Sequence, residues 1–200
     1  SNVQNYGQEH WANSALIIAP HPDDETLGCG GTILKKCRAG ATVYVLFMTD
    51  GSKSHHFLLP PDELSHVRKS EAIAACEQLG VPEKNVIFLG YEDGILQSKF
   101  DEATATVTAL LQTYRPAEIF IPYYLDSHPD HVATNQIVRT AFAAATDVTS
   151  IFYEYPIWIW QHWPWVNMPL GFERAKLSLV KRSLMSQFGL RMLTDFDLGM

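Results

Sequence analysis

Short apolar runs alternate with helix-like segments along most of the chain, and this alternation constrains the fold more than any other feature. The apolar, β-rich runs are expected to form strands at residues 15–19, 43–48, 86–89, 118–122 and 150–155. Helices are expected between and after them, at about residues 27–38, 64–79, 101–114, 131–145 and 171–188. Strands that alternate with helices are typical of βαβ units. The sequence therefore predicts a single Rossmann-like α/β domain, with a mostly parallel sheet and helices on both faces.

The size and composition of the chain fit one globular domain over residues 1–200. Two hundred residues with 46% hydrophobic content are enough to bury most of the apolar surface of such a domain. The sequence contains no repeat, linker or low-complexity segment. We interpret residues 1–12 as a tag or an arm, and the absence of a clear helix cap at residues 197–200 as a sign of a truncated C-terminus.

Charge, hydropathy and cysteine usage argue against several classes of partner. The net charge is −7 and no dense Lys/Arg block is present, which argues against nucleic acid because neutralising phosphates needs clustered basic charge. No apolar run reaches the roughly 18 residues of a membrane span, and no signal peptide is recognisable. Cys29, Cys37 and Cys76 are odd in number and form no C-x-x-C pair, so we expect reduced thiols and a cytoplasmic protein.

The first chemically informative cluster runs from His21 to Glu25 and reads His-Pro-Asp-Asp-Glu. It follows the expected strand at 15–19, so it would lie at the carboxyl edge of the sheet, where ligands bind. Capping of the next helix would explain one acid in its first turn, but not three acids and a histidine. His21 and Asp24, three residues apart around a turn, could face one cation, with Asp23 on the other side beside a metal-bound water.

A glycine-rich stretch, Gly28-Cys29-Gly30-Gly31, offers a competing interpretation as a phosphate-binding loop. Asp50 even follows the second expected strand, near the position of a ribose-binding acid. The dinucleotide fingerprint should begin directly after the strand, however, and its third glycine position is Ile33 here. An acidic loop would also repel a pyrophosphate. We therefore expect these glycines to let the helix pack close to the sheet.

The second cluster runs from Asp126 to His131 and reads Asp-Ser-His-Pro-Asp-His. It follows the expected strand at 118–122 and opens a helix, so it should meet the first cluster at the same sheet edge. His131, in the first helical turn, is the better-placed metal ligand. His128 is then free to be protonated, with Asp126 or Asp130 close enough to orient it and raise its pKa. The reverse division between the two histidines stays open.

Together the two clusters could supply a metal with nitrogen and oxygen ligands. His21, Asp24 and one histidine of the second cluster would leave one coordination position open, which is typical of a catalytic zinc site.

In this order and on this frame, the clusters resemble the PIG-L/LmbE family of zinc-dependent N-acetylglucosaminyl deacetylases. The match is full over the five residues that begin at His21 and over the four that begin at His128. Weaker matches run along most of the chain, at Thr49-Asp50-Gly51, Arg68 with Glu71, Asp93-Gly94 and Ser186-Gln187.

The resemblance implies a role for each matched position. His21, Asp24 and His131 would be zinc ligands, Asp23 the general base, and His128 the group that stabilises the oxyanion or donates a proton. Some family members have a tyrosine two residues before the equivalent of His128, where this chain has Asp126. A carboxylate cannot replace a phenol there, so Asp126 is expected to orient His128.

The reaction implied is removal of the N-acetyl group from an N-acetylglucosamine-type sugar or glycoconjugate, in which zinc-bound water attacks the amide and Asp23 accepts a proton. The partner would be a small amino-sugar conjugate of unspecified aglycone. Two alternatives stay open: a zinc-dependent amidase for a non-sugar N-acyl substrate, and a non-catalytic module that binds a sugar or nucleotide. Zn²⁺ is the expected cofactor, with another divalent ion such as Fe²⁺ as the alternative.

Three further residues are candidates for substrate contact. Trp158 and Trp160 belong to the tryptophan-rich segment 157–165, which could line the site or instead form a buried crossover or a homo-oligomer contact. Arg68 could reach the substrate, or pair with Glu71 at the surface. Asp50 could orient a metal-binding histidine, or merely form a turn.

Overall fold

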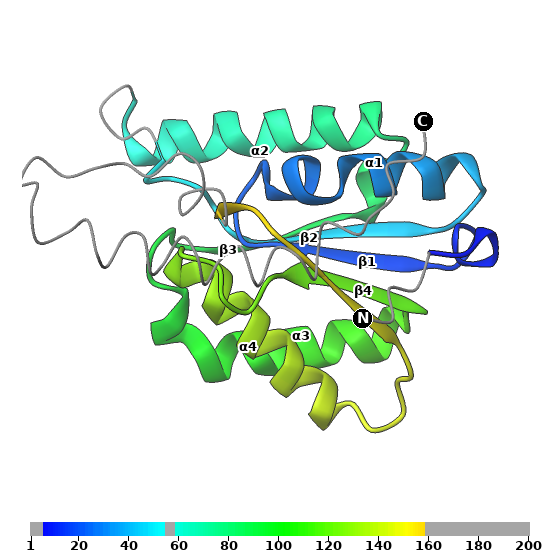
Figure 1. Cartoon of the computed structure of the whole chain (residues 1–200). Coiled ribbons are helices and arrows are strands. Elements are labelled where there is room, and N and C mark those ends of the chain that lie inside the picture. Colours follow the sequence, from blue (N-terminus) through cyan, green and yellow to red (C-terminus); the bar gives the residue numbers. More distant parts are fainter. Residues whose placement is uncertain (1–5, 55–58, 159–200) are drawn as a thin grey trace, which may run out of the picture. The chain divides into compact units, whose positions relative to one another are not determined.

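The described part of the chain contains a five-stranded, all-parallel sheet (Figure 1). The computed structural model describes residues 6–54 and 59–158. The strands are β1 (Ala15–Ala19), β2 (Val43–Thr49), β3 (Val86–Tyr91), β4 (Glu118–Pro122) and β5 (Ile151–Tyr155), in the spatial order β3-β2-β1-β4-β5. The strand order therefore reverses between β1 and β4. In open α/β sheets the crevice at such a reversal, at the carboxyl ends of the strands, is where ligands bind.

Helices cover both faces of this sheet, and the predicted α/β architecture is confirmed. The helices are α1 (Asp24–Arg38), α2 (Pro61–Gln78), α3 (Phe100–Tyr114) and α4 (Pro129–Ala144), with short 3-10 turns η1 (Gln8–His10), η2 (Glu83–Asn85) and η3 (Leu96–Lys99). Figure 1 shows α1 and α2 on one face of the sheet and α3 and α4 on the other. These strands and helices lie in one compact unit, Glu9–Ile157, apart from the first residue of η1. The predicted helix at 171–188 lies outside the described residues, and one domain over 1–200 stays a prediction.

The central strand β1 and its neighbour β4 are buried along their whole length. All residues of β1 and β4 are buried, as expected of parallel strands covered on both faces. The larger apolar layer packs α3 and α4 against the sheet through side chains such as Leu111, Ile119 and Ile137. Two fully buried strands thus carry the loops that follow β1 and β4.

Three helices begin two or three residues earlier than the sequence predicts. α1 begins at Asp24, α2 at Pro61 and α4 at Pro129, whereas starts near 27, 64 and 131 are expected. The early residues are acidic or proline, which suit a first helical turn but carry no apolar periodicity. As a result, both clusters lie at helix N-termini that point toward the same sheet edge.

Close packing of α1 against the sheet depends on one glycine of the glycine-rich stretch. A Cβ atom at Gly28 would lie 2.2 Å from Cδ2 of Tyr155, at the end of β5. At Gly31, by contrast, no atom lies within 4 Å of an added Cβ, and at Gly30 the contacts are ordinary. The predicted close approach is therefore correct for Gly28 alone.

Candidate metal centre

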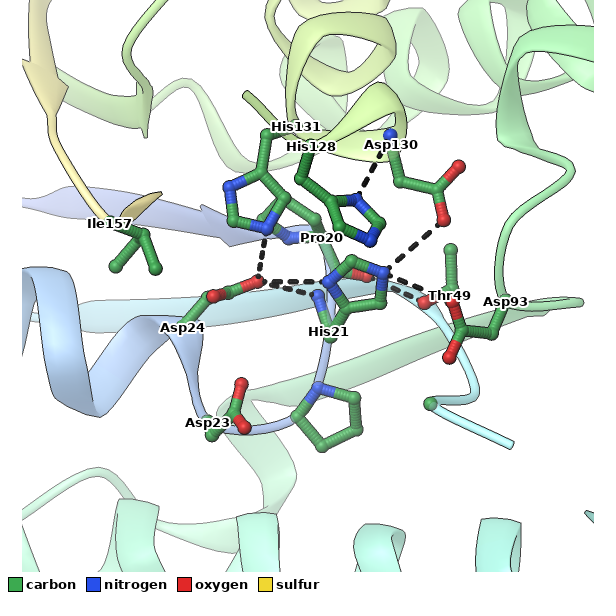
Figure 2. A network of polar contacts seen from close by, with 12 residues as sticks. Pro20, His21, Asp23, Asp24, Thr49, Asp93, His128, Asp130, His131 and Ile157 are labelled. Atoms are coloured by element: carbon green, nitrogen blue, oxygen red, sulfur yellow. Dashed lines mark hydrogen bonds and ion pairs between the residues drawn. The ribbon is translucent and has the colours of Figure 1, made fainter. Parts of the chain in front are cut away.

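The two sequence clusters meet where β1 and β4 end (Figure 2). His21 and Asp130 are 109 residues apart in sequence, yet Nε2 of His21 lies 3.2 Å from Oδ2 of Asp130. The ring of His21 lies 4.7 Å from that of His128 and 5.3 Å from that of His131, between centroids. Adjacent parallel strands produce this meeting, because each delivers its following loop to the same edge.

Asp24 lies between two histidine rings. Its Oδ2 atom is 3.2 Å from Nδ1 of His21 and 3.2 Å from Nε2 of His131, and it also accepts the backbone N–H of His21 at 3.0 Å. Asp24 and His131 are both buried, with exposed fractions of 2% and 0%. The carboxylate and the two imidazoles thus present three potential ligand atoms to one small region.

His131 supplies a direct indication that this region suits a cation. Neither of its ring nitrogens makes a hydrogen bond of acceptable geometry, although both are buried and face carboxylates. Buried polar nitrogens are normally paired, and an unpaired one calls for an explanation such as an ion. Two imidazole nitrogens and a carboxylate oxygen are also the ligands that divalent zinc prefers. The donor set therefore fits a metal.

Two groups of three residues in the described part of the chain have potential ligand atoms that all lie within 4.8 Å of one another, and Asp24 belongs to neither. The groups are His21 with His128 and His131, and His21 with Asp93 and Asp130. In the second group, His21 uses Nε2, which lies 3.2 Å from Asp130 and 3.3 Å from Asp93. Carboxylates on the far nitrogen of a metal-binding histidine typically fix its ring orientation. Asp93 and Asp130 fit that supporting position.

Asp130 is held rigidly for such a role. Its two carboxylate oxygens accept the backbone N–H groups of Gly94 at 2.7 Å and Leu96 at 3.2 Å. Asp130 therefore faces His21, not the ring of His128 that the sequence suggested as its partner.

Asp126 contacts a ring other than the one expected, whereas the contacts of Asp50 fit the turn that was one of its two alternatives. Oδ2 of Asp126 lies 3.4 Å from Nδ1 of His131, while Oδ1 accepts the backbone N–H of His128 at 3.1 Å. Asp126 thus faces the ring of His131. Asp50 accepts the backbone N–H groups of Ser52 at 3.0 Å and Asp93 at 3.1 Å, and so joins two loops beside the site.

Asp93 is the contributing residue that sequence reasoning left out of the site. Its Oδ1 atom faces His21, and its Oδ2 atom accepts the backbone N–H of Lys53 at 3.1 Å. The available signal was its position directly after the third strand, at the same edge as both histidine clusters. That signal alone does not separate a site residue from a turn residue.

The electrostatics of the centre favour positive charge. Burial lowers the pKa of His21, but Asp130, Asp24 and Asp93 outweigh burial and raise it to about 11. Burial likewise lowers the pKa of His131, and Asp126 and Asp24 outweigh it and raise the pKa. Burial raises the pKa of Asp24, yet the two histidines hold it well below its usual range. Carboxylates that stabilise protonated rings would equally stabilise a divalent cation between them.

His128 differs from the other two histidines, and the expected rise in its pKa is wrong. Burial, followed by the charges of His21 and His131, lowers the pKa of His128 despite the nearby Asp130 and Asp93. Its Nδ1 atom accepts the backbone N–H of Asp130 at 3.3 Å, as a cap of α4. Since Nδ1 is the acceptor, the neutral ring carries its proton on Nε2.

Asp23 and Asp24 point to different partners. Asp23 occupies the N-cap position of α1, but its side chain makes no capping hydrogen bond. Its backbone has φ 133°, in a region that few residues except glycine adopt. Its carboxylate is half-exposed and accepts a hydrogen bond from Nη2 of Arg68 at 2.7 Å. Burial raises the pKa of Asp23, although Arg68 opposes the rise.

The remaining candidates for substrate contact are only partly described. Arg68 contacts the backbone carbonyl of Pro22 and the carboxylate of Asp23, which accounts for its position without substrate. Trp158 is 42% exposed and belongs to a different compact unit from the centre, whereas Trp160 lies outside the described residues. No helix in the described part of the chain is both long and apolar enough to cross a bilayer.

Comparison with known proteins agrees with this geometry. A model of the PIG-L family, described as GlcNAc-PI de-N-acetylase, matches residues 16–142. A 1D-myo-inositol 2-acetamido-2-deoxy-alpha-D-glucopyranoside deacetylase from Saccharopolyspora erythraea is 29% identical over 178 residues. That match covers 70% of this chain and 57% of the relative, so the chain spans little more than half of the relative's length.

Solved structures share the fold. The N,N'-diacetylchitobiose deacetylase from Pyrococcus horikoshii matches with a TM-score of 0.65 and 24% identity, over 91% of this chain and 73% of that one. The 4-carboxy-2-hydroxymuconate hydratase GalB from Pseudomonas putida matches with a TM-score of 0.59 and 20% identity, over 64% and 55%. At such identities the likeness shows the fold alone. The presence of a hydratase means that the reaction must be argued from the site.

Proposed function

Because the chain belongs to the PIG-L family of de-N-acetylases, we propose that it is a zinc-dependent hydrolase that removes the N-acetyl group from an N-acetylglucosamine-type sugar or glycoconjugate. The observation that carries the proposal is the meeting of His21, Asp24 and His131 beside a separate, half-exposed carboxylate, Asp23. A hydratase shares the fold, so an unsaturated acid belongs among the substrates to be tested.

His21, Asp24 and His131 are the residues that would hold the zinc. Bound there, zinc would act as a Lewis acid toward the acetamide carbonyl and lower the pKa of water from about 15.7 toward 7. We choose His131 over His128 as a ligand because Nε2 of His131 lies 3.2 Å from Asp24 and lacks a hydrogen-bond partner. His128 already uses Nδ1 to cap α4.

Asp23 is suited to act as the general base. Its carboxylate follows directly on Pro22 and projects away from Asp24, so it need not act as a metal ligand. Burial raises its pKa, which brings the carboxylate closer to the range in which it can both accept and return a proton near neutral pH. Asp23 would take a proton from the attacking water and return it to the departing amine.

His128 is suited to stabilise the oxyanion. With Nδ1 accepting from the backbone and its pKa lowered, the ring is neutral at pH 7 and its Nε2–H can donate a hydrogen bond. A fixed donor aimed at developing negative charge typically contributes about 100- to 1,000-fold in rate. This role needs no protonated imidazole, in contrast to the proton-donating alternative.

The test is amine and acetate release from a panel of N-acetylglucosamine conjugates, measured with zinc-loaded and chelator-treated protein. The panel includes an N-acetylated non-sugar amine and an unsaturated carboxylic acid. Zinc-dependent release from a sugar conjugate would support the proposal. Release only from the non-sugar amine, or hydration of the unsaturated acid alone, would replace it. The absence of any zinc binding would refute the site itself.

A further inference from the structure

Glu25 is a charged residue that the site has not used and yet is fully buried, with an exposed fraction of 0%. A buried carboxylate is costly unless hydrogen bonds satisfy its oxygens. Oε1 accepts from the hydroxyl of Thr26 at 2.5 Å, and Oε2 accepts the backbone N–H of Asp23 at 3.0 Å. One of the two described partners of Glu25 is therefore the backbone of Asp23, the residue with φ 133°.

The conformation of Asp23 needs such a partner. A non-glycine residue in a sparsely populated backbone region is strained and persists only where its surroundings hold it. Downstream, the carbonyl of Asp23 accepts the N–H groups of Thr26 at 3.1 Å and Leu27 at 2.9 Å, which fixes that side to α1. The N–H side is fixed by Glu25. The peptide on either side of Asp23 is thus anchored independently.

This conformation has a consequence for the direction of the side chain. A residue at an N-cap usually has extended backbone angles and turns its side chain back onto the free N–H groups of the first turn. With φ 133° the carboxylate of Asp23 makes no such bond and is left half-exposed, against Arg68. A relaxed backbone would let the carboxylate cap α1 instead.

We propose that Glu25 is a positioning residue that holds the backbone of Asp23 in its positive-φ conformation and so keeps the carboxylate off the helix N-terminus and available for proton transfer. The inference rests on the proposed function, since it assigns Asp23 the role of base. Glu25 does not touch the substrate and acts only through the N–H of Asp23.

A simpler role for Glu25 is a favourable charge at a helix N-terminus. Glu63, exposed in the first turn of α2, offers the matched control for that role. Removing either carboxylate takes one negative charge from a first turn, but only Glu25 contacts the preceding helix cap. The positioning role predicts that only substitution of Glu25 lowers kcat, and only while Asp23 is present. The charge role predicts similar effects for Glu25 and Glu63.

The first experiment compares crystal structures of the parent, Glu25→Gln, Glu25→Asp and Glu25→Ala proteins. Gln retains an oxygen acceptor for the N–H of Asp23, whereas Asp is one methylene too short and Ala has no acceptor. We expect a positive φ at Asp23 in the Gln variant and a negative φ in the other two. A positive φ in the Asp or Ala variant would overturn the proposal, whether or not any activity has been found.

The second experiment is a kinetic double-mutant cycle with Asp23→Asn. Glu25→Ala and Glu25→Asp should lower kcat about 10- to 100-fold through misplacement of the base, with KM and metal content unchanged. Glu25→Gln should stay within about threefold of the parent, and Glu63→Ala should match it. In the Asp23→Asn background, substitution of Glu25 should lower kcat no further.

An equal loss in both backgrounds would overturn the proposal, because Glu25 would then act on something other than Asp23. Should Glu25→Ala fail to fold, Glu25→Asp keeps the cycle decisive, since it retains the charge. If the parent protein releases no acetate from any conjugate, the proposed function fails, whereas the crystal structures still decide whether Glu25 holds Asp23.

Discussion

Asp23 combines an acidic side chain with a backbone conformation that suits glycine. Substitution of Asp23 should therefore change the stability and the activity of the protein in different directions. With φ 133°, strain of about 1–3 kcal/mol is stored at this residue. Its ion pair with Arg68 is half-exposed on the Asp23 side and contributes about 0–1 kcal/mol at most. The backbone strain at Asp23 thus exceeds the stabilisation that the ion pair with Arg68 provides.

We expect Asp23→Gly to abolish activity by about 100-fold or more while leaving the protein as stable as the parent or slightly more stable. Asp23→Ala removes the same carboxylate but keeps the strain, so it should be less stable than the glycine variant by about 1 kcal/mol. Urea unfolding of the three proteins measures the difference. Equal stability of the Ala and Gly variants would show that residue 23 stores no strain.

Asp130 supports His21 from the nitrogen that does not face Asp24, so its removal should act on metal retention. Asp130→Asn keeps an oxygen acceptor but loses the charge opposite Nε2 of His21. Loss of a carboxylate behind a metal-binding histidine typically costs about 10- to 100-fold in metal affinity. Competition with a chromogenic chelator measures this, with Asp101→Asn, exposed in the first turn of α3, as the control. Unchanged affinity would remove Asp130 from the supporting shell of the metal.

At the scale of secondary-structure elements, α1 approaches β5 closely at Gly28. A Cβ at position 28 would meet Cδ2 of Tyr155 at 2.2 Å and Cε2 at 2.7 Å. The ring cannot turn aside freely, because it is buried and its hydroxyl donates to the carbonyl of Ile18 at 2.7 Å. Any added atom must therefore displace α1, which carries Asp24, from the sheet.

We expect Gly28→Ala to destabilise the fold by about 1–3 kcal/mol, as overpacking of a core usually does. Gly31→Ala lies in the same helix and adds a Cβ with nothing within 4 Å, so it should stabilise by about 0.5–1 kcal/mol. Chemical denaturation of both variants measures the free energy of unfolding, which should fall for Gly28→Ala and rise for Gly31→Ala. Similar stability of the two variants would mean that α1 packs less closely on Tyr155 than the structure indicates.

The elements themselves were largely predictable, because continuous apolar runs such as 43–48 mark buried strands and Gly40 and Gly80 mark helix ends with positive φ. The meeting of the two clusters followed from parallel strands, without knowledge of side chains. The partners of individual carboxylates, by contrast, could not be predicted from the sequence. Whether Asp126 faces His128 or His131 depends on side-chain rotamers and loop angles, which spacing does not determine. The φ of Asp23 was equally hidden, since an aspartate before a helix usually has extended backbone angles and nothing in the spacing marks an exception.

At the scale of the whole described unit, the candidate metal centre lies at the carboxyl edge of the sheet, and a buried ion pair lies near the opposite edge. Nζ of Lys36, in the last turn of α1, lies 2.6 Å from Oε2 of Glu118, the first residue of β4, and both side chains are fully buried. Lys36 also donates to the carbonyls of His10 at 2.9 Å and Asn13 at 3.0 Å. One ammonium therefore ties α1, β4 and the segment before β1 together.

Breaking this pair should destabilise the fold without altering the chemistry. Lys36→Met leaves the carboxylate of Glu118 buried without its ammonium, which typically costs about 3–5 kcal/mol. Lys36→Met combined with Glu118→Leu removes both charges and should recover much of that loss, although the carbonyls of His10 and Asn13 stay without the lysine. Thermal and urea unfolding measure the two variants.

The exposed pair between Lys99 and Glu102, 3.2 Å apart, is the matched control, and Lys99→Met should cost less than about 1 kcal/mol. Per folded molecule, metal content and kcat should stay at the parent value in both Lys36 variants, because the pair lies at the amino end of β4 and the centre follows its carboxyl end. A double variant no more stable than Lys36→Met would show that the lysine acts through the two carbonyls instead of through Glu118. A changed kcat would show that the two edges of the sheet are coupled.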